Sequence, residues 1–140
     1  MILFDTNVIL DALFEDSEFF GWATALIIKS APTIGAAVNA ITVAELCARD
    51  RHPEMVEQDL ENWGIKILDV PAAAASVCGL AHHRYLQARR ASGGGHALKT
   101  PLPDFFIGAH AEIMKWKLAT RDTERISRYF PKVQLLTPKK

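Results

Sequence analysis

The chain has 140 residues, of which 49% are apolar and 23% charged, and its 16 basic side chains balance its 16 acidic ones. A chain of this length buries roughly 68% of its unfolded surface, enough for one core without disulfides or a structural metal. The two cysteines are too few for a disulfide scaffold, and no apolar run reaches the roughly 20 residues that cross a bilayer. We therefore expect a single soluble domain over residues 1–140, cytoplasmic and without a membrane partner.

Apolar periodicity and helix breakers divide the chain into alternating strands and helices. In chain order we expect a strand at 1–4, helices at 7–14 and 17–29, a strand at 33–38, helices at 42–49 and 53–63, a strand at 65–68, a long helix from 71 that ends before the glycine run at 92–95, a helix from 103, a strand at 117–119, a helix at 123–129 and a strand at 133–136. This alternation predicts an α/β fold, an α/β/α sandwich around a mainly parallel sheet.

The neutral overall charge hides an asymmetry between the two halves. Residues 1–70 carry twelve acidic and four basic side chains, whereas residues 71–140 carry twelve basic and four acidic ones. The basic side chains that stand out as candidates for contacting a polyanion are Arg84, Arg89, Arg90 and Lys99. A solvated helix face explains them equally well. Together with an acidic half, however, they also suit a protein that holds a cation and binds a phosphodiester.

Four acidic side chains follow predicted strands at comparable places. Asp5 ends the first strand and Glu45 lies in the first turn after the second. Asp104 begins a helix, and Asp122 separates a strand from the next helix. In a parallel sheet such junctions share the carboxyl edge, so all four side chains can converge there. Carboxylates about 4 Å apart repel by roughly 4 kcal/mol at an effective dielectric of about 20, so a fold that gathers them needs a cation. Oxygen ligands favour Mg²⁺ or Mn²⁺.

Each acid also has a purely structural explanation. Asp5 and Asp122 can cap the helices that follow them, and Asp104 is favoured in a first turn by the helix dipole. Glu45 can complete a capping box with Thr42 as the cap. One such acid is uninformative, but four together favour a divalent ion that activates a water and neutralises charge during phosphodiester hydrolysis.

Four segments in the same order resemble the motifs of PIN-domain ribonucleases. They are residues 1–8 (MILFDTNV), 41–46 (ITVAEL), 102–110 (LPDFFIGAH), and 118–122 (LATRD) with 129–131 (YFP). Order and spacing are similar over essentially the whole chain. The short length and the ending at 133–138 are most similar to the VapC-type toxins of toxin–antitoxin pairs.

The resemblance implies a PIN-like fold and a Mg²⁺- or Mn²⁺-dependent endoribonuclease that cuts tRNA or rRNA. The catalytic and metal-binding residues that it implies are Asp5, Glu45, Asp104 and Asp122. The residues implied to orient carboxylates or waters around them are Thr6, Asn7 and Thr120. It further implies a homodimer that can enter a larger toxin–antitoxin assembly, a cognate antitoxin that silences it, and contact with DNA only through that antitoxin.

We expect the antitoxin to cover the aromatic early helices and to deliver a basic side chain into the acids. The aromatic residues concerned are Phe14, Phe19, Phe20 and Trp22. The tryptophans, Trp63 among them, fit core positions better than base-stacking platforms. An alternative of a different class is a non-catalytic PIN-like binding module that partners a DNA-binding repressor, with the acids serving as caps. A flap-type DNA nuclease is disfavoured because the chain has no room for the extra helices of such enzymes.

Overall fold

The structure, a computed structural model, describes residues 1–93 and 102–139. Its strands form one sheet in the order β3-β2-β1-β4-β5, and all neighbouring strands are parallel. The strands are β1 (Ile2–Phe4), β2 (Ala36–Asn39), β3 (Ile65–Leu68), β4 (Lys117–Ala119) and β5 (Leu135–Leu136). The second strand begins later than predicted because Thr33 and Gly35 donate to the carbonyl of Ser30 and continue the preceding helix as a turn.

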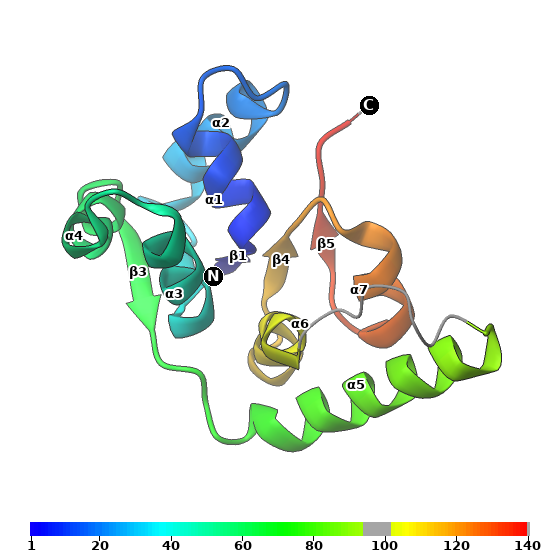
Figure 1. Cartoon of the computed structure of the whole chain (residues 1–140). Helices are drawn as coiled ribbons and strands as arrows, with labels where there is room; N and C mark the ends of the chain where they lie inside the picture. The colour runs from blue at the N-terminus through cyan, green and yellow to red at the C-terminus, as the bar shows by residue number, and fades with distance from the viewer. Residues whose placement is uncertain (94–101, 140) are drawn as a thin grey trace.

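Helices connect successive strands, as the alternation predicts (Figure 1). They are α1 (Thr6–Leu13), α2 (Phe20–Ser30), α3 (Ala40–Arg49), the 3₁₀ turn η1 (Pro53–Met55), α4 (Val56–Asn62), α5 (Ala74–Ala91), α6 (Leu102–Met114) and α7 (Thr123–Tyr129). The helix predicted at 53–63 is divided because Pro53 opens a 3₁₀ turn before α4. Within the described residues, no helix is both long and apolar enough to span a membrane.

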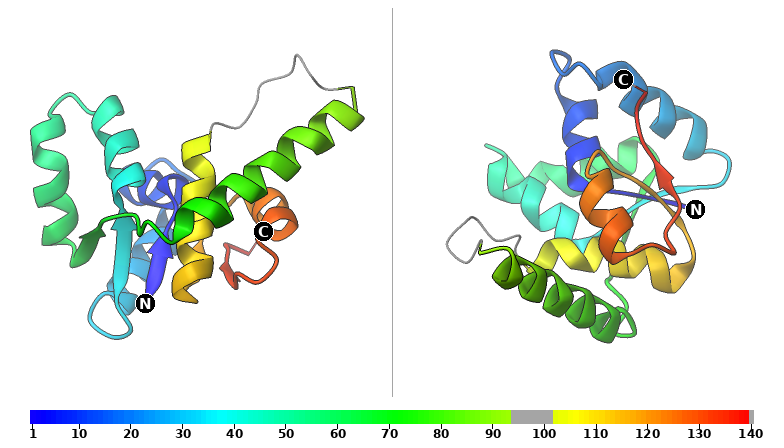
Figure 2. Two further views of the ribbon diagram at one scale, coloured as in Figure 1. Left: turned by 90° about the horizontal axis from the view of Figure 1, so that it is seen from below. Right: turned by 90° about the vertical axis from the view of Figure 1, so that its right-hand side faces the viewer.

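The two faces of the sheet carry separate hydrophobic cores. Successive strand side chains point to opposite faces, so Ile2 and Phe4 join one core and Leu3 joins the other. Helices α1 to α4 cover the first face and α5 to α7 the second, as Figures 1 and 2 show. The predicted α/β/α sandwich with a parallel sheet is thereby confirmed.

The strand order reverses next to β1, and this reversal positions the site. From β1 the chain moves outward to β2 and β3, and then returns to place β4 on the other side of β1. The connections that leave the carboxyl ends of β1 and β4 therefore diverge, and in open parallel sheets ligands bind in the crevice at such a point. Asp5 follows β1 there, and Thr120 follows β4.

Helix α6 packs closely against the segment that follows α7. A Cβ built on Gly108 would lie only 2.5 Å from a ring carbon of Phe130, whereas one on Gly79 of α5 would meet nothing within 4 Å. The bare backbone of Gly108 therefore sets how near α6 can approach the Phe130 ring.

Gly108→Ala is expected to destabilise the protein by about 1–3 kcal/mol, because the added methyl group overpacks this contact. The control Gly79→Ala adds the same methyl group to an open position in a helix, and it is expected to stabilise by about 1 kcal/mol. Urea unfolding of both variants measures the difference, and equal midpoints would contradict the packing argument.

Candidate functional site

Asp5 is a buried carboxylate held by three donors from different parts of the chain. As the N-cap of α1 it accepts the backbone N–H of Thr6 at 2.7 Å on Oδ1. Its Oδ2 accepts the Thr120 hydroxyl at 2.7 Å and the Asn7 side-chain amide at 3.2 Å. Burial raises the pKa of Asp5, although the hydrogen bonds from Thr120 and Thr6 lower it. A carboxylate offers about four acceptor positions, so one stays open to a cation.

Thr6 connects Glu45 to Asp5, because its backbone N–H donates to Asp5 and its hydroxyl donates to Glu45. The Thr6 hydroxyl donates to Glu45 Oε1 at 3.0 Å and also lies 3.1 Å from the Thr42 hydroxyl oxygen. The capping-box interpretation of Glu45 is wrong, because α3 begins before Thr42 and its cap is Asn39, whose Oδ1 accepts two N–H groups of the first turn. Glu45 therefore lies in the second turn, and its carboxylate is directed to the carboxyl edge of the sheet by Thr6.

Asp104 and Asp122 approach the same edge from α6 and α7. Asp104 lies in the first turn of α6, where a carboxylate was expected from the helix dipole. Asp122 occupies the N-cap position of α7, yet its side chain makes no capping bond and instead forms an ion pair with Arg125. The capping explanation therefore holds for Asp5 but not for Asp122.

The charges of these four acids act on one another. Burial raises the pKa of Glu45, and the charges of Asp104 and Asp5 raise it further. Burial likewise raises the pKa of Asp104, which Arg125 lowers and Asp122 raises. Asp122 also raises the pKa of Asp5. The raised pKa values of Asp5, Glu45 and Asp104 thus mark an electrostatic environment in which the arrival of a cation would be favourable.

Over the described residues, no three His, Cys, Asp or Glu side chains form a ready-made metal cluster. Mg²⁺ is usually held by one or two carboxylates and keeps several waters. The donor set fits such an ion: hard carboxylate oxygens, an open acceptor position on Asp5, and pKa values raised partly by mutual repulsion.

Two polar networks that the sequence analysis did not identify connect the elements around the acids. Asn7 Oδ1 accepts the backbone N–H of Arg121 at 3.2 Å. The guanidinium of Arg121 in turn binds buried Asp11, with Nε 2.6 Å from Oδ2, and lies 5.0 Å from the centroid of the Phe19 ring. The only sequence signal was that Arg121 lies next to Asp122. This network fixes α1 against the loop that follows β4.

The second network joins α6 to the start of α3. Asn39 Oδ1 faces two backbone N–H groups, so its Nδ2 donates to His110 Nδ1 at 3.2 Å. The His110 ring is therefore neutral, with its proton on Nε2. Burial lowers the pKa of His110, which favours the same form. Both side chains are buried, and they tie the helix that carries Asp104 to the helix that carries Glu45.

Three of the four basic residues predicted to contact a polyanion, Arg84, Arg89 and Arg90, lie on α5, which crosses α6 (Figure 2). Arg84 and Arg90 are exposed, and the guanidinium carbon of Arg89 lies 5.7 Å from the centroid of the Tyr85 ring. Lys99 falls outside the described residues. The charge that lowers the pKa values of Asp5 and Asp104 is instead that of Arg125 on α7, which the sequence analysis did not identify.

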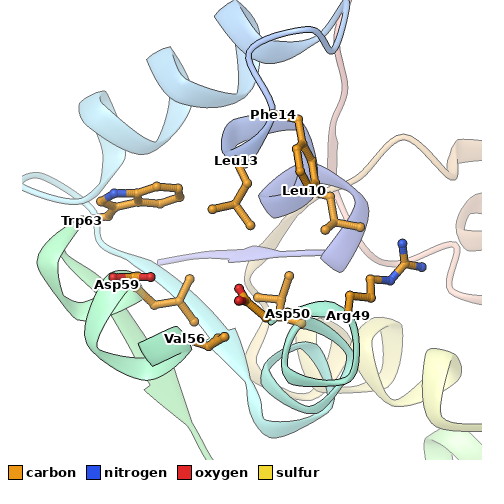
Figure 3. A pocket seen from close by; sticks show the side chains of 10 residues that line it. Leu10, Leu13, Phe14, Arg49, Asp50, Val56, Asp59 and Trp63 are labelled. Atoms are coloured by element: carbon orange, nitrogen blue, oxygen red, sulfur yellow. The ribbon is translucent and has the colours of Figure 1, made fainter. Parts of the chain in front are cut away.

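An apolar groove lies between α1, α3 and α4 (Figure 3). Its lining residues include Leu10, Leu13, Phe14, Arg49 and Trp63. Phe14 is 57% exposed and Trp63 37% exposed, so the assignment of Trp63 to the core is wrong. Phe14 belongs to both this groove and the aromatic surface predicted from the sequence.

Comparisons with known proteins agree on the fold. The sequence model described as the PIN domain matches residues 2–130. FitAcB from Neisseria gonorrhoeae is similar at 25% identity and a TM-score of 0.66, covering 97% of this chain and 96% of that one. FitAB bound to an IR36 DNA fragment is 26% identical with a TM-score of 0.67, covering 99% and 95%. A toxin–antitoxin complex from Klebsiella pneumoniae is 21% identical with a TM-score of 0.65, covering 100% and 99%. Among curated proteins, none matches the chain.

Asp104→Asn is expected to raise the urea midpoint of the metal-free protein at pH 7. Because burial raises the pKa of Asp104 from 3.8, the folded state binds the proton more tightly than the unfolded state. Stability therefore falls as pH rises from 3.8 through the raised pKa, and the full cost remains at pH 7. The amide avoids that cost.

The comparison is made by urea unfolding with a chelator at pH 7 and at pH 3, where the advantage of the amide should vanish. Glu57→Gln, an exposed acid on α4, is the matched control and should leave the midpoint unchanged. A lower midpoint for Asp104→Asn at pH 7 would show that Asp104 is stabilising as a charge.

Proposed function

The chain belongs to the PIN domain family, and on that premise we propose that it is a Mg²⁺- or Mn²⁺-dependent endoribonuclease, the toxin of a toxin–antitoxin pair. One observation carries the proposal. Three buried or half-buried carboxylates, Asp5 after β1, Glu45 on α3 and Asp104 on α6, have pKa values that burial raises and that the charges of neighbouring carboxylates raise further, and Asp5 lies where the strand order reverses. A purely structural role gives no reason to gather like charges there, whereas a divalent ion offsets their repulsion.

In this proposal the site consists of acidic residues that bind the ion and of polar residues that position those acids. The residues that would hold the ion are Asp5, Glu45, Asp104 and Asp122. A bound ion would acidify a water and neutralise charge on the phosphodiester. Thr6 holds the Glu45 carboxylate through its hydroxyl, while Asn7 and Thr120 hold Asp5. These three donors act as positioning residues, because each fixes the rotamer of an acid.

RNA is the proposed substrate, with tRNA or rRNA as the class. The exposed arginines of α5, Arg84 and Arg90, together with Arg89 and Lys99, supply positive charge for a phosphate backbone. The arginines lie on the helix that crosses α6, and the first turn of α6 carries Asp104. RNA that follows α5 would therefore pass close to the acids.

The proposed partner is a small antitoxin that also binds DNA, and the proposed assembly contains a homodimer of this chain in the cytoplasm. The structurally similar proteins include a toxin–antitoxin complex from Klebsiella pneumoniae and FitAB bound to a DNA fragment. The groove of Figure 3 is a largely apolar surface to which a segment of the antitoxin could bind. Arg49 lines this groove and its charge also lowers the pKa of Glu45, so a segment in the groove would end beside the acids.

Asp5→Asn is expected to reduce Mg²⁺-dependent RNA cleavage by at least about 100-fold, because an acidic ligand is lost while the cap of α1 is kept. Cleavage of total RNA by the purified protein is followed with Mg²⁺ and with a chelator. Glu57→Gln is the control, with unchanged cleavage. If wild-type protein and Asp5→Asn cleave equally, the acids are not the catalytic centre. If neither cleaves while both bind the partner, the chain is a binding module.

Phe14→Asp is expected to abolish co-purification with the proposed antitoxin, because a carboxylate loses its hydration when it enters an apolar groove. Phe14 is largely exposed, so the fold should tolerate the change. The control is Ile28→Asp on α2, which is 73% exposed and does not line the groove. Retention of the partner by Phe14→Asp would exclude the groove as its binding surface.

A further inference from the structure

Arg125 is a cation beside the acids of the site, and two contacts determine its place. Its guanidinium forms an ion pair with Asp122, three residues earlier. The guanidinium carbon lies 5.7 Å from the centroid of the Phe105 ring, and Phe105 directly follows Asp104. The Arg125 side chain is only 24% exposed and that of Asp122 30%. A guanidinium stays charged at every relevant pH, so this site contains a permanent positive charge.

The Asp122 carboxylate pairs with Arg125 and does not cap α7. An aspartate at an N-cap position normally accepts an N–H of the first turn. Asp122 makes no such bond and pairs with Arg125 instead. Its backbone is fixed independently, because its N–H donates to the Thr120 hydroxyl at 3.0 Å, and that hydroxyl donates to Asp5. Arg125 therefore decides where this carboxylate points.

We propose that Arg125 is a positioning residue that competes with the divalent ion for the carboxylates. It holds Asp122 away from the metal until another anionic group binds Arg125. This inference rests on the proposed function, because it concerns the affinity of the same site for its ion. Two positive charges cannot both lie against Asp122 and Asp104 without repelling each other. The effect of Arg125 in lowering the pKa values of Asp104 and Asp5 shows that its charge reaches both.

The competition gives RNA a way to tighten metal binding. A guanidinium binds phosphate as readily as carboxylate, with two parallel hydrogen bonds. When a phosphate of the substrate pairs with Arg125, the Asp122 carboxylate is free to bind the ion. Metal and RNA therefore bind with positive coupling. By linkage, the ion must then raise the affinity for RNA by the same factor.

The test measures the binding of Mn²⁺ alone, without RNA, by electron paramagnetic resonance of the free ion. Arg125→Ala is expected to bind Mn²⁺ about tenfold more tightly than wild type or better, and Arg125→Lys should show a smaller gain. The matched control is Arg128→Ala, which removes a guanidinium from the same helix that stacks on Tyr129 at 5.5 Å. Its Mn²⁺ affinity should equal that of wild type.

A second measurement shows whether the effect passes through Asp122. In an Asp122→Asn background, Arg125→Ala should change Mn²⁺ affinity much less than in wild type, because the carboxylate that Arg125 holds is gone. The Mg²⁺ concentration for half-maximal RNA cleavage should fall in Arg125→Ala. Circular dichroism establishes whether each variant is folded. If Arg125→Ala does not fold, Arg125→Lys still tests the competition.

Unchanged or weaker Mn²⁺ binding by folded Arg125→Ala and Arg125→Lys would overturn the competition and make Arg125 a support of the site. Loss of cleavage at saturating Mg²⁺ with unchanged Mn²⁺ affinity would overturn it in favour of a direct phosphate contact. If no protein, wild type included, binds Mn²⁺ or cleaves RNA, the proposed function itself fails. If wild type does both and the Arg125 variants bind Mn²⁺ as it does, only this inference fails.

Discussion

The burial of one carboxylate at the carboxyl end of the central strand constrains most of this structure. Asp5 is 8% exposed, and a buried charge is costly unless it is hydrogen-bonded. Its donors come from Thr6 and Asn7 on α1 and from Thr120, which lies 115 residues further along the chain. The hydrogen bond to Thr120 is available only because β4 pairs with β1. The sheet order and the stabilisation of this charge therefore depend on each other.

The elements around Asp5 are held in place by polar side chains rather than by apolar packing alone. Arg121 and Asp11 fix α1 to the loop after β4, and Asn39 and His110 fix α3 to α6. Such bonds are directional, so they set rotation and register more narrowly than hydrophobic contacts do. The carboxylates that they position still repel one another, as the raised pKa values show. The site is thus preorganised at an electrostatic cost that a bound cation would relieve.

Among the described residues, the arginines of α5 and Arg125 of α7 differ in exposure, and therefore in the range over which their charges act. Those on α5 are exposed or partly exposed and suit long-range attraction of a polyanion. Arg125 is mostly buried among the acids and the Phe105 ring, so its charge acts at short range. Arg49 links the acids to the groove between α1, α3 and α4. In the proposed function, this arrangement would bring substrate attraction, metal affinity and partner binding together on one small domain.

Local sequence patterns determined the succession of strands and helices, the parallel sheet, and the positions of Asp5 and Asp122 just after strands and of Asp104 at a helix start. These features follow from periodicity and breakers within a few residues, and the resemblance to PIN domains followed from the same short motifs. Only the tertiary structure decided which group each polar side chain meets. Asn39 caps α3 in place of Thr42, and Arg125, which no local pattern singled out, lowers the pKa of Asp104 by its charge.

Trp63 and the pairing of Arg121 with Asp11 show the same limit, because their surroundings come from helices distant in sequence. Hydrogen bonds and ion pairs across about 110 residues depend on strand order and on the angle between helices. A local pattern shows which polar side chains are available. The geometry of the assembled sheet decides which of them meet, because a hydrogen bond forms only when donor and acceptor come within about 3 Å in the right direction.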